Sequence, residues 1–415
     1  MAPAKLGAMD TGDTAWLLVS AALVMLMTPA LAMFYGGMVQ GKNVLSTFMH
    51  SFFSLGLVTI QFVLIGYSLC FGPSVHGVIG NLDFIGLSGI EDTALSADVK
   101  VPHLAFVAYQ CMFAVIAPAL ISGAYAERMK FGAYALFTLG WTTLVYDPIA
   151  HWSWQADGWL MKLGAIDFAG GTVVHLSSGV SALVVALVLG KRKGYPATRH
   201  VPHDLTMTVI GAGILWFGWF GFNAGSALGA NGLAARALLN THVAAAAGAI
   251  AWVLFEGARI KKVTMLGLAS GLVAGLVAIT PAAGFVGPTT ALLIGFIAGG
   301  ICYGAVLMKS RLGYDDALDA FGVHGVGGAT GALLTGLFAR AIDNKGLGGG
   351  AELVTNQLIA IGAAVAWSGV VTFVLLKVLD LTVGLRVNVE VEHDGLDGAL
   401  HGESAYGSPS GAAHS

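Results

Sequence analysis

Asp167-Phe-Ala-Gly-Gly-Thr-Val-Val-His175 begins one apolar stretch of the chain, and Asp316-Ala-Leu-Asp-Ala-Phe-Gly-Val-His324 begins another. In each motif a histidine follows an aspartate by eight positions, with glycine nearby. Eight residues rise about 12 Å along an α-helix, and the hydrocarbon core of a bilayer is about 30 Å thick. If each aspartate lies at a membrane surface, each histidine lies near the middle of the membrane.

The composition around these motifs is that of a polytopic membrane protein. Of the 415 residues, 56% are hydrophobic and 10% are charged, whereas about a quarter of a soluble protein is charged. This deficit excludes an ordinary soluble enzyme, and it excludes a disordered chain, which needs high charge and low hydrophobicity. The net charge of −3 and the lack of a basic domain exclude a nucleic-acid-binding protein. The 59 glycines indicate closely packed helices.

Apolar segments long enough to span a bilayer occur eleven times, since a span needs about 20 residues. They are 14–39, 47–72, 102–125, 131–152, 168–190, 205–227, 237–257, 264–282, 289–309, 320–341 and 353–380. Five plus five helices of opposite orientation form the inverted repeat of many transporters, with the substrate path between the halves. We therefore predict an all-α fold with eleven transmembrane helices. Its channel domain, 1–380, has halves at about 14–190 and 205–341 and a last helix at about 353–380, before a tail at 381–415.

Basic residues predict the orientation of this domain. Of the 20 Lys and Arg residues, fourteen lie in one set of alternate connections and six in the other. Because cytoplasmic connections are rich in Lys and Arg, the N-terminus is expected outside and the C-terminus inside. Ala30-Leu31-Ala32 resembles a signal-peptide cleavage site, but Asp10 and Asp13 make a poor preceding region, which favours a retained first helix. A separate signal removed upstream of residue 1 stays open.

His175 and His324 occupy matching positions in the last helix of each predicted half. A pseudo-twofold axis would bring these helices together, and with them the imidazoles. One such histidine would be interpreted as a polar group bonded to a neighbouring helix. Two matched ones favour a function, because intramembrane ionisable groups usually mark a substrate or proton path. Adjacent imidazoles would titrate as a coupled pair, with at least one neutral.

Aromatic residues gather at the outer ends of three predicted spans. Tyr109 and Phe113 share one helix face in the third span. His151-Trp-Ser-Trp154 ends the fourth, and Trp219-Phe-Gly-Phe222-Asn-Ala-Gly-Ser226 ends the sixth. An aromatic belt at the membrane surface explains any one of them. Together with a serine hydroxyl they could hold a small cation through cation–π interactions and one hydrogen bond. The residues alone leave both interpretations open.

No motif predicts an enzyme, a cofactor or a metal site. The sequence contains no P-loop, no zinc-protease HExxH and no GxSxG. Cys70, Cys111 and Cys302 are scattered through apolar stretches without the spacing of a metal site or a redox CxxC. We therefore expect neither catalysis nor a bound metal.

From the first span to the tail, the chain resembles the ammonium transporter (Amt/Mep) family. Besides Asp167–His175, the resemblance is carried by Phe34-Tyr-Gly-Gly-Met-Val-Gln-Gly-Lys-Asn43, Gly123-Ala-Tyr-Ala-Glu-Arg128, Gly218-Trp-Phe-Gly-Phe-Asn-Ala-Gly-Ser226, Phe321-Gly-Val-His-Gly325 and Asp380-Leu-Thr-Val-Gly-Leu-Arg386. It implies a homotrimer in the cytoplasmic (inner) membrane, with one ammonium-conducting pore per subunit. In this family the cytoplasmic face is often blocked by a PII-type signalling protein.

The resemblance also implies roles for single residues along a pore. By position, Trp154, Phe113 and Ser226 look like the outer ammonium recruitment site. Phe113 and Phe222 look like the stacked rings that close the pore. The residues that look like the pore lining below the rings are His175, His324 and Trp219.

Other positions resemble supporting parts of the family pattern. Asp167 looks like its buried acidic residue, which supports the site without binding substrate, and Asp316 is the counterpart in the second motif. Tyr109 stands where phenylalanine is common, so it adds a hydroxyl near the entrance, and we count it among the expected substrate-binding residues. The stretch 394–403 resembles the family's regulatory tail, and we expect its first part to dock on the cytoplasmic loops.

Selectivity suggests how such a pore would work. A charged ion at the bilayer centre costs several kcal/mol or more, whereas ammonium can lose a proton and continue as neutral ammonia. We therefore expect recruitment at the aromatic site, deprotonation near Phe113 and Phe222, and passage of ammonia along His175 and His324.

Two alternatives stay open. An Rh-like gas channel is less favoured because the cage with Trp154 and Ser226 looks like the Amt branch. An ammonium receptor with little flux is less favoured because the tail of 35 residues, 381–415, is too short for a signalling domain.

Overall fold

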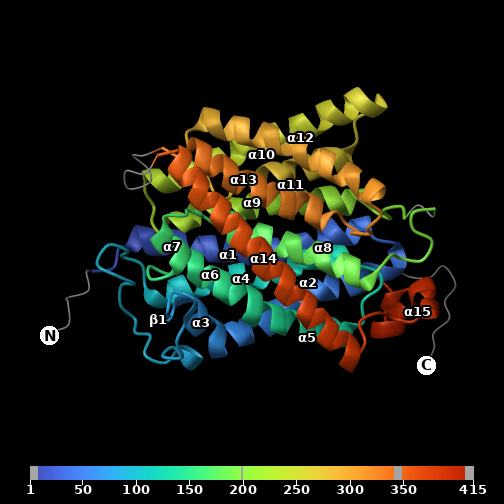
Figure 1. Ribbon diagram of the computed structural model, residues 1–415, viewed down its shortest axis with the longest axis horizontal. Helices are drawn as coiled ribbons and strands as arrows, with labels where there is room; N and C mark the ends of the chain where they lie inside the picture. The colour runs from blue at the N-terminus through green and yellow to red at the C-terminus, as the bar shows by residue number, and fades with distance from the viewer. Residues whose placement is uncertain (1–7, 198–199, 341–347, 407–415) are drawn as a thin grey trace.

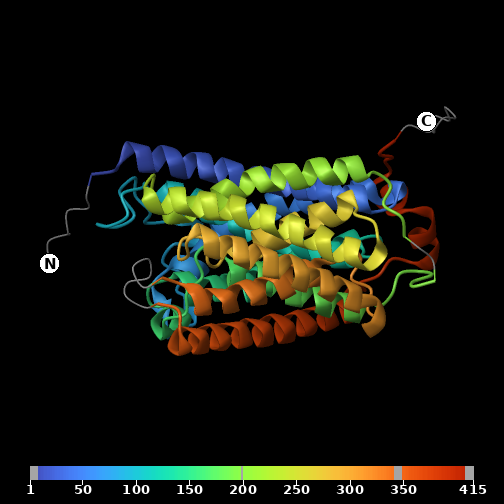
Figure 2. The ribbon, with the colours of Figure 1, turned by 90° about the horizontal axis from the view of Figure 1, so that it is seen from above.

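The computed structural model describes residues 8–197, 200–340 and 348–406. Long helices run side by side along the long axis of the molecule, so that their ends gather at two opposite faces (Figures 1 and 2). One face carries residues 385–406 and is called the tail face below. The other carries the beginning of the first helix and is called the vestibule face.

Residues 8–197 form the first part of the bundle. Its elements are α1 (Thr11–Met38), η1 (Gly41–Asn43), α2 (Val44–Gln61), η2 (Phe62–Gly66), α3 (Tyr67–Phe71), β1 (Ser74–Val75), β2 (Ile79–Gly80), η3 (Ile85–Leu87), α4 (His103–Tyr125), α5 (Phe131–Trp141), η4 (Thr142–Tyr146), α6 (Asp147–Trp154), α7 (Trp159–Leu163), η5 (Gly171–Leu176) and α8 (Ser177–Leu189). The two strands make a minimal antiparallel pair in a connection.

The remaining described residues complete the bundle. Their elements are α9 (Leu205–Ala224), η6 (Gly225–Ala227), α10 (Gly232–Ile260), α11 (Met265–Ile279), α12 (Pro288–Leu312), η7 (Phe321–Gly325), α13 (Val326–Phe338), α14 (Ala351–Thr382), α15 (Val389–Asp394) and η9 (Asp397–His401). Helices α10 to α12 lie on one side of the bundle and α2, α3 and α5 on the other, while α14 crosses the front diagonally (Figure 1).

The prediction of an all-α polytopic membrane protein is confirmed. Within the described residues, nine helices are long and apolar enough to cross a membrane. Predicted span 264–282 is not among them, because α11 has only 15 residues, which rise about 22 Å. Predicted span 131–152 runs as three consecutive helical pieces, α5, η4 and α6. The count of eleven and the division into two halves stay predictions.

Both aspartate–histidine motifs form π-helical turns at the beginning of a helix. His175 lies in η5, which continues into α8, and His324 lies in η7, which continues into α13. The two helices cross in backbone contact: a Cβ added to Gly179 would lie 2.0 Å from the backbone nitrogen of Gly325. Only glycine permits this approach, so the crossing depends on it.

A buried ion cluster joins three connections at the tail face. Arg192 donates to Glu127 at 2.7 Å and to Asp315 at 2.8 Å. Burial raises the pKa of both carboxyls, but the Arg192 guanidinium outweighs it, so that the pKa of Glu127 is lowered and that of Asp315 falls to about 2. Both carboxylates therefore stay charged and hold the connections together.

The tail docks against this face through hydrogen bonds to the beginning of α2. The Asp397 carboxylate accepts from the backbone nitrogens of Leu45 at 3.0 Å and Ser46 at 2.8 Å. These are amides that the first turn of a helix leaves without intrahelical partners. Leu396 donates its backbone N–H to the Asn43 side chain at 2.8 Å. The expected docking of the first part of the tail is thus present in the structure.

Replacing Gly179 with alanine should destabilise the protein. The added methyl group cannot fit against the Gly325 backbone, and overpacking of this kind costs about 1–3 kcal/mol. We expect a lower melting temperature in detergent for Gly179→Ala than for Gly213→Ala, because Gly213 has open space around its Cβ position. Equal melting temperatures for the two variants would mean that the crossing tolerates a larger separation.

Candidate functional site

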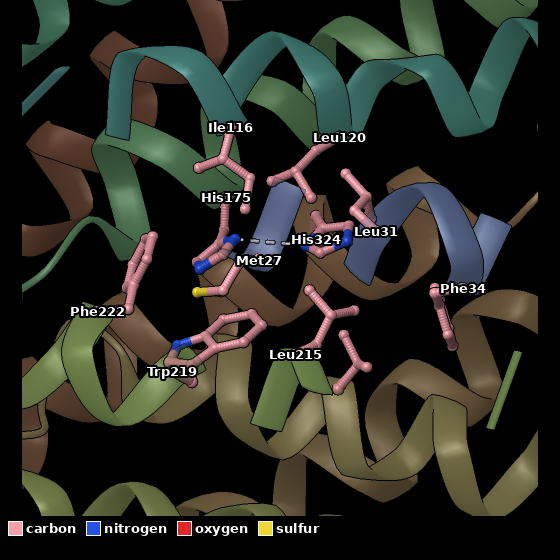
Figure 3. Close-up of a pocket in the computed structure, with 11 residues that line it drawn as sticks. Met27, Leu31, Phe34, Ile116, Leu120, His175, Leu215, Trp219, Phe222 and His324 are labelled. Atoms are coloured by element: carbon pink, nitrogen blue, oxygen red, sulfur yellow. Dashed lines mark hydrogen bonds between the residues drawn. The ribbon is translucent and has the colours of Figure 1, made fainter. Parts of the chain in front are cut away.

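His175 and His324 face each other at the helix crossing. Their Nδ1 atoms lie 3.3 Å apart, and their rings are nearly parallel at 5.4 Å between centroids (Figure 3). Both side chains are almost fully buried. Because one Nδ1 must donate for the other to accept, the pair holds one proton between the rings. The second nitrogen of His175, Nε2, has no hydrogen-bond partner among the described residues.

The aspartates of the two motifs differ in the number of hydrogen bonds that hold their carboxylates. The Asp167 carboxylate accepts four backbone N–H groups at 2.7–3.0 Å, from Gly170, Gly171, Thr172 and Val173. The Asp316 carboxylate accepts from Phe321 at 2.8 Å, and its Oδ1 lacks a partner within the described part of the chain. Burial raises the pKa of both, to about 6 for Asp316. Asp167 is therefore the better anchored of the two.

A narrow cavity of about 10 Å³ runs beside the two imidazoles (Figure 3). This is about the space that one water molecule needs. The residues that line it are Met27, Leu31, Phe34, Ile116, Leu120, His175, Leu215, Trp219, Phe222, Val273 and His324. The Trp219 ring stacks on His175 at 5.2 Å, and its N–H is used by Thr280 at 2.9 Å. The histidines are thus the polar groups that this cavity offers.

Two stacked rings close the cavity toward the vestibule face. Phe113 and Phe222 lie 4.2 Å apart between centroids, at an angle of 28°. Above them is a second cavity of about 120 Å³, called the vestibule here. Its lining residues are Phe71, Phe106, Gln110, Phe113, Trp154, Phe168, Ser226 and Leu228. The predicted residues Phe113, Trp154 and Ser226 therefore meet in one place.

Trp154 and Ser226 are held at the vestibule by hydrogen bonds to the backbone. The Trp154 N–H donates to the carbonyl of Asp167 at 2.9 Å, and its ring stands edge-on to Phe113 at 5.8 Å. The Ser226 hydroxyl donates to the carbonyl of Phe222 at 3.0 Å. Its oxygen therefore keeps a lone pair that can accept a hydrogen bond from a bound cation.

Tyr109 lies behind the vestibule and not among the residues that line it. Its side chain is fully buried, and its hydroxyl reaches the carbonyls of Phe222 at 2.7 Å and Gly221 at 2.9 Å. It also lies 3.1 Å from the Ser226 hydroxyl. The structure therefore places the predicted extra hydroxyl where it positions Ser226 and the Phe222 backbone.

Gln110 is a vestibule residue that the sequence interpretation missed. Its Oε1 is buried and has no hydrogen-bond partner in the described chain, although the residue lines the vestibule. The available signal was a lone amide in the apolar helix α4, next to Tyr109 and three residues before Phe113. An unpaired carbonyl oxygen in this place can accept from a hydrogen-bonding cation.

A third cavity, of about 40 Å³, continues from the histidines toward the tail face. Phe34, Val273 and His324 line both it and the narrow cavity. Asp319 lies at its rim and pairs with Lys309 at 2.5 Å. The three cavities thus follow one another through the bundle. Among the described residues, no group of three or more His, Cys, Asp or Glu side chains could hold a metal ion.

Comparison with known proteins assigns the chain to a family. The model of the Ammonium Transporter Family matches residues 15–406. The chain belongs to this family. Its relatives are named as transporters and not as enzymes, in agreement with the prediction.

Similar sequences extend over nearly the whole chain. An "Ammonium transporter" of Bacillus subtilis is 51% identical over 404 residues, which cover 96% of this chain and 99% of that protein. One from Mycobacterium tuberculosis is 48% identical, covering 97% of this chain and 91% of that protein.

Solved structures of the family have the same fold. Saccharomyces cerevisiae Mep2 is 38% identical with a TM-score of 0.86, covering 92% of this chain and 88% of that one. A structure named "Sensor Amt Protein" is 31% identical with a TM-score of 0.88, covering 94% of this chain and 98% of that one.

Proposed function

We propose that this protein transports ammonium across the cytoplasmic membrane, recruiting it at the vestibule and conducting it as ammonia past His175 and His324. The order of the cavities supports this proposal. An aromatic vestibule is followed by the stacked rings of Phe113 and Phe222, by a narrow cavity with two histidines and by an exit cavity. Relatives that match nearly the whole length of the chain are named ammonium transporters.

Recruitment rests on the faces of aromatic rings and on two oxygen atoms. Trp154 and Phe113 present their rings to the vestibule, where a cation–π interaction contributes about 0.5–2 kcal/mol. Ser226 Oγ and Gln110 Oε1 accept hydrogen bonds from the ammonium N–H groups. Potassium and sodium lack such N–H donors, and they would need more oxygen atoms than these two to replace their hydration shells.

Conduction beyond the rings requires loss of the charge, so ammonium leaves one proton with the water of the vestibule and continues as ammonia. A cavity of about 10 Å³ lined by apolar side chains leaves no room for a hydration shell, and an unpaired charge there is costly. Ammonia carries no charge and fits. The free Nε2 of His175 can exchange a hydrogen bond with it, while the shared Nδ1 proton keeps both imidazoles oriented.

The assembly and orientation belong to the same proposal. We place the vestibule face outside and the tail face in the cytoplasm, with three subunits and one pore in each. The richer set of basic connections includes Lys42, Arg192 and Arg386, which lie at the tail face. A PII-type protein would approach this face, because the pore exit opens toward it.

A second candidate function is ammonium sensing with little flux. The similarity to a protein named "Sensor Amt Protein" favours it, and the docked tail would carry the signal. Flux measured together with binding of a PII-type protein separates the two functions. A conducting protein keeps its flux in proteoliposomes without any partner, whereas a sensor shows binding with little flux.

Replacing either pore histidine with alanine should lower ammonium flux and selectivity. His175→Ala and His324→Ala remove the polar groups of the narrow cavity and leave the remaining imidazole unpaired. Methylammonium flux in proteoliposomes measures the effect. His242→Ala is the control, because this histidine lies on a spanning helix and stacks on Trp216 away from the cavities. Wild-type flux and selectivity in both pore variants would refute the proposed role.

Gln110→Leu should raise the KM for ammonium more than it changes the maximal flux. A hydrogen bond to a charged group contributes about 1.5–3 kcal/mol, which corresponds to roughly tenfold or more in affinity. Concentration-dependent flux provides the measurement. Gln155→Leu serves as the matched control, because its side chain bonds to Asp157 on the same face. A KM equal to that of the control would remove Gln110 from the recruitment site.

Truncation after Arg386 should lower the flux severalfold. It removes Asp397 and exposes the amides at the beginning of α2, and it removes Glu392 from Arg386. Truncation after Tyr406 is the control, because it spares these contacts. The transport rates of both variants are measured in proteoliposomes. An unchanged rate after truncation at Arg386 would argue against a regulatory tail.

A further inference from the structure

A polar cavity of about 320 Å³ lies at the tail face, apart from the transport path. It has no lining residue in common with the three cavities of that path. Four segments form its wall: the link from α1 to α2, the connection after α4, the connection after α8 and the tail. The lining residues are Gln40, Lys42, Asn43, Glu127, Arg192, Lys193, Gly194, His200, Glu392 and His393.

The two carboxylates in this wall already have their hydrogen-bond donors. Glu127 Oε1 accepts from the Gln40 backbone at 2.9 Å and from Asn43 at 3.0 Å, and its Oε2 accepts from Arg192 at 2.7 Å. Glu392 Oε1 accepts from the Lys193 backbone at 2.6 Å, and its Oε2 from Arg386 at 2.7 Å. Neither carboxylate therefore needs a cation in the cavity.

The donors in the same wall are used less completely. Lys42 gives one hydrogen bond to the His393 carbonyl, which leaves two further N–H groups on its ammonium. The Lys193 side chain is exposed, and its ammonium has no partner recorded among the residues described. Three basic residues, Lys42, Arg192 and Lys193, face two acidic ones, Glu127 and Glu392, so that the wall carries one excess positive charge.

His200 adds a neutral donor to this set. Its Nδ1 lies 3.1 Å from Gln40 Nε2, which is an amide donor, so Nδ1 accepts and the ring proton lies on Nε2. Burial and the nearby Arg192 lower the pKa of His200, which keeps the ring neutral. The Nε2 atom has no hydrogen-bond partner in the described segments. Donors thus outnumber free acceptors.

We propose that this cavity binds a small soluble anion of the phosphate class, such as a phosphate ester or a diphosphate. A volume of about 320 Å³ is many times the roughly 10–15 Å³ that one water molecule needs, so the cavity has room for a phosphate ester or a diphosphate. The wall consists of connections, η1 and the tail, so the anion enters from the water side. Its oxygens accept from Lys42, Lys193 and His200.

Bound anion would hold the tail in its docked position. Lys193 and His200 belong to the connection after α8, whereas Glu392 and His393 belong to α15 in the tail. The anion reaches the tail through Lys42, which also donates to the His393 carbonyl, and it neutralises the excess charge of the wall. We therefore expect anion binding to protect the tail from proteolysis.

Pyrophosphate is the probe, added to the purified full-length protein in detergent without lipid, at constant ionic strength in potassium chloride. Binding is followed by the melting temperature and by the rate of proteolytic cleavage of the tail. We expect a saturable rise in melting temperature and slower cleavage. The absence of a saturable effect beyond that of chloride would overturn the proposal.

Two lysine variants test the site itself. Lys193→Gln removes the ammonium but keeps the backbone N–H that binds Glu392, and it should weaken pyrophosphate binding about tenfold. Lys191→Gln is the matched control, because Lys191 is exposed, lies near Gly313 and does not line the cavity. Equal weakening in both variants would mean an adventitious ion only.

Measurements in nanodiscs distinguish a lipid head group from a soluble anion as the occupant of the cavity. Pyrophosphate binding should be equal in discs of phosphatidylcholine and in discs that also contain phosphatidic acid. Loss of pyrophosphate binding in the second kind would overturn the assignment to a soluble anion, because the head group would then occupy the cavity. His200→Leu provides a second variant, whose affinity should fall without loss of the Glu392 contact.

Discussion

The contact between His175 and His324 is the interaction on which the rest of the site depends. Their Nδ1 atoms meet at 3.3 Å because α8 and η7 cross in backbone contact at Gly179 and Gly325. A wider crossing would leave both buried imidazoles without this hydrogen bond, at a cost of about 1–3 kcal/mol for each unpaired group. The same crossing sets the place of Trp219, whose ring stacks on His175.

The aromatic residues along the path are fixed by their polar ends. Trp154 donates to the Asp167 carbonyl, Trp219 to Thr280 and Tyr109 to the Phe222 carbonyl. With these donors used inside the bundle, the rings of Trp154 and Trp219 present faces and edges to the cavities. The path therefore combines apolar walls with few hydrogen-bonding atoms, and this combination separates a neutral molecule from an ion.

The tail face follows the opposite rule, since charge is concentrated there and paired. Arg192 holds Glu127 and Asp315, and Arg386 holds Glu392. Water is close at this face, so ion pairs tie connections together without placing charge in the membrane. The tail docks here by hydrogen bonds instead, because the Asp397 carboxylate accepts the free amides of α2.

The membrane class, most of the spans and the residues around the two motifs could be predicted from the sequence alone. These features are local: hydropathy is read residue by residue, and the spacing from Asp167 to His175 sets a depth along one helix. The family followed from motifs that keep their order along the chain.

Only the tertiary structure decided which side chains meet across helices. It placed Tyr109 behind Ser226, brought Gln110 to the vestibule and made the Asp316 carboxylate less well bonded than that of Asp167. Crossing distance and competition for hydrogen-bond donors decide these contacts, and neither is visible in the order of residues along one helix.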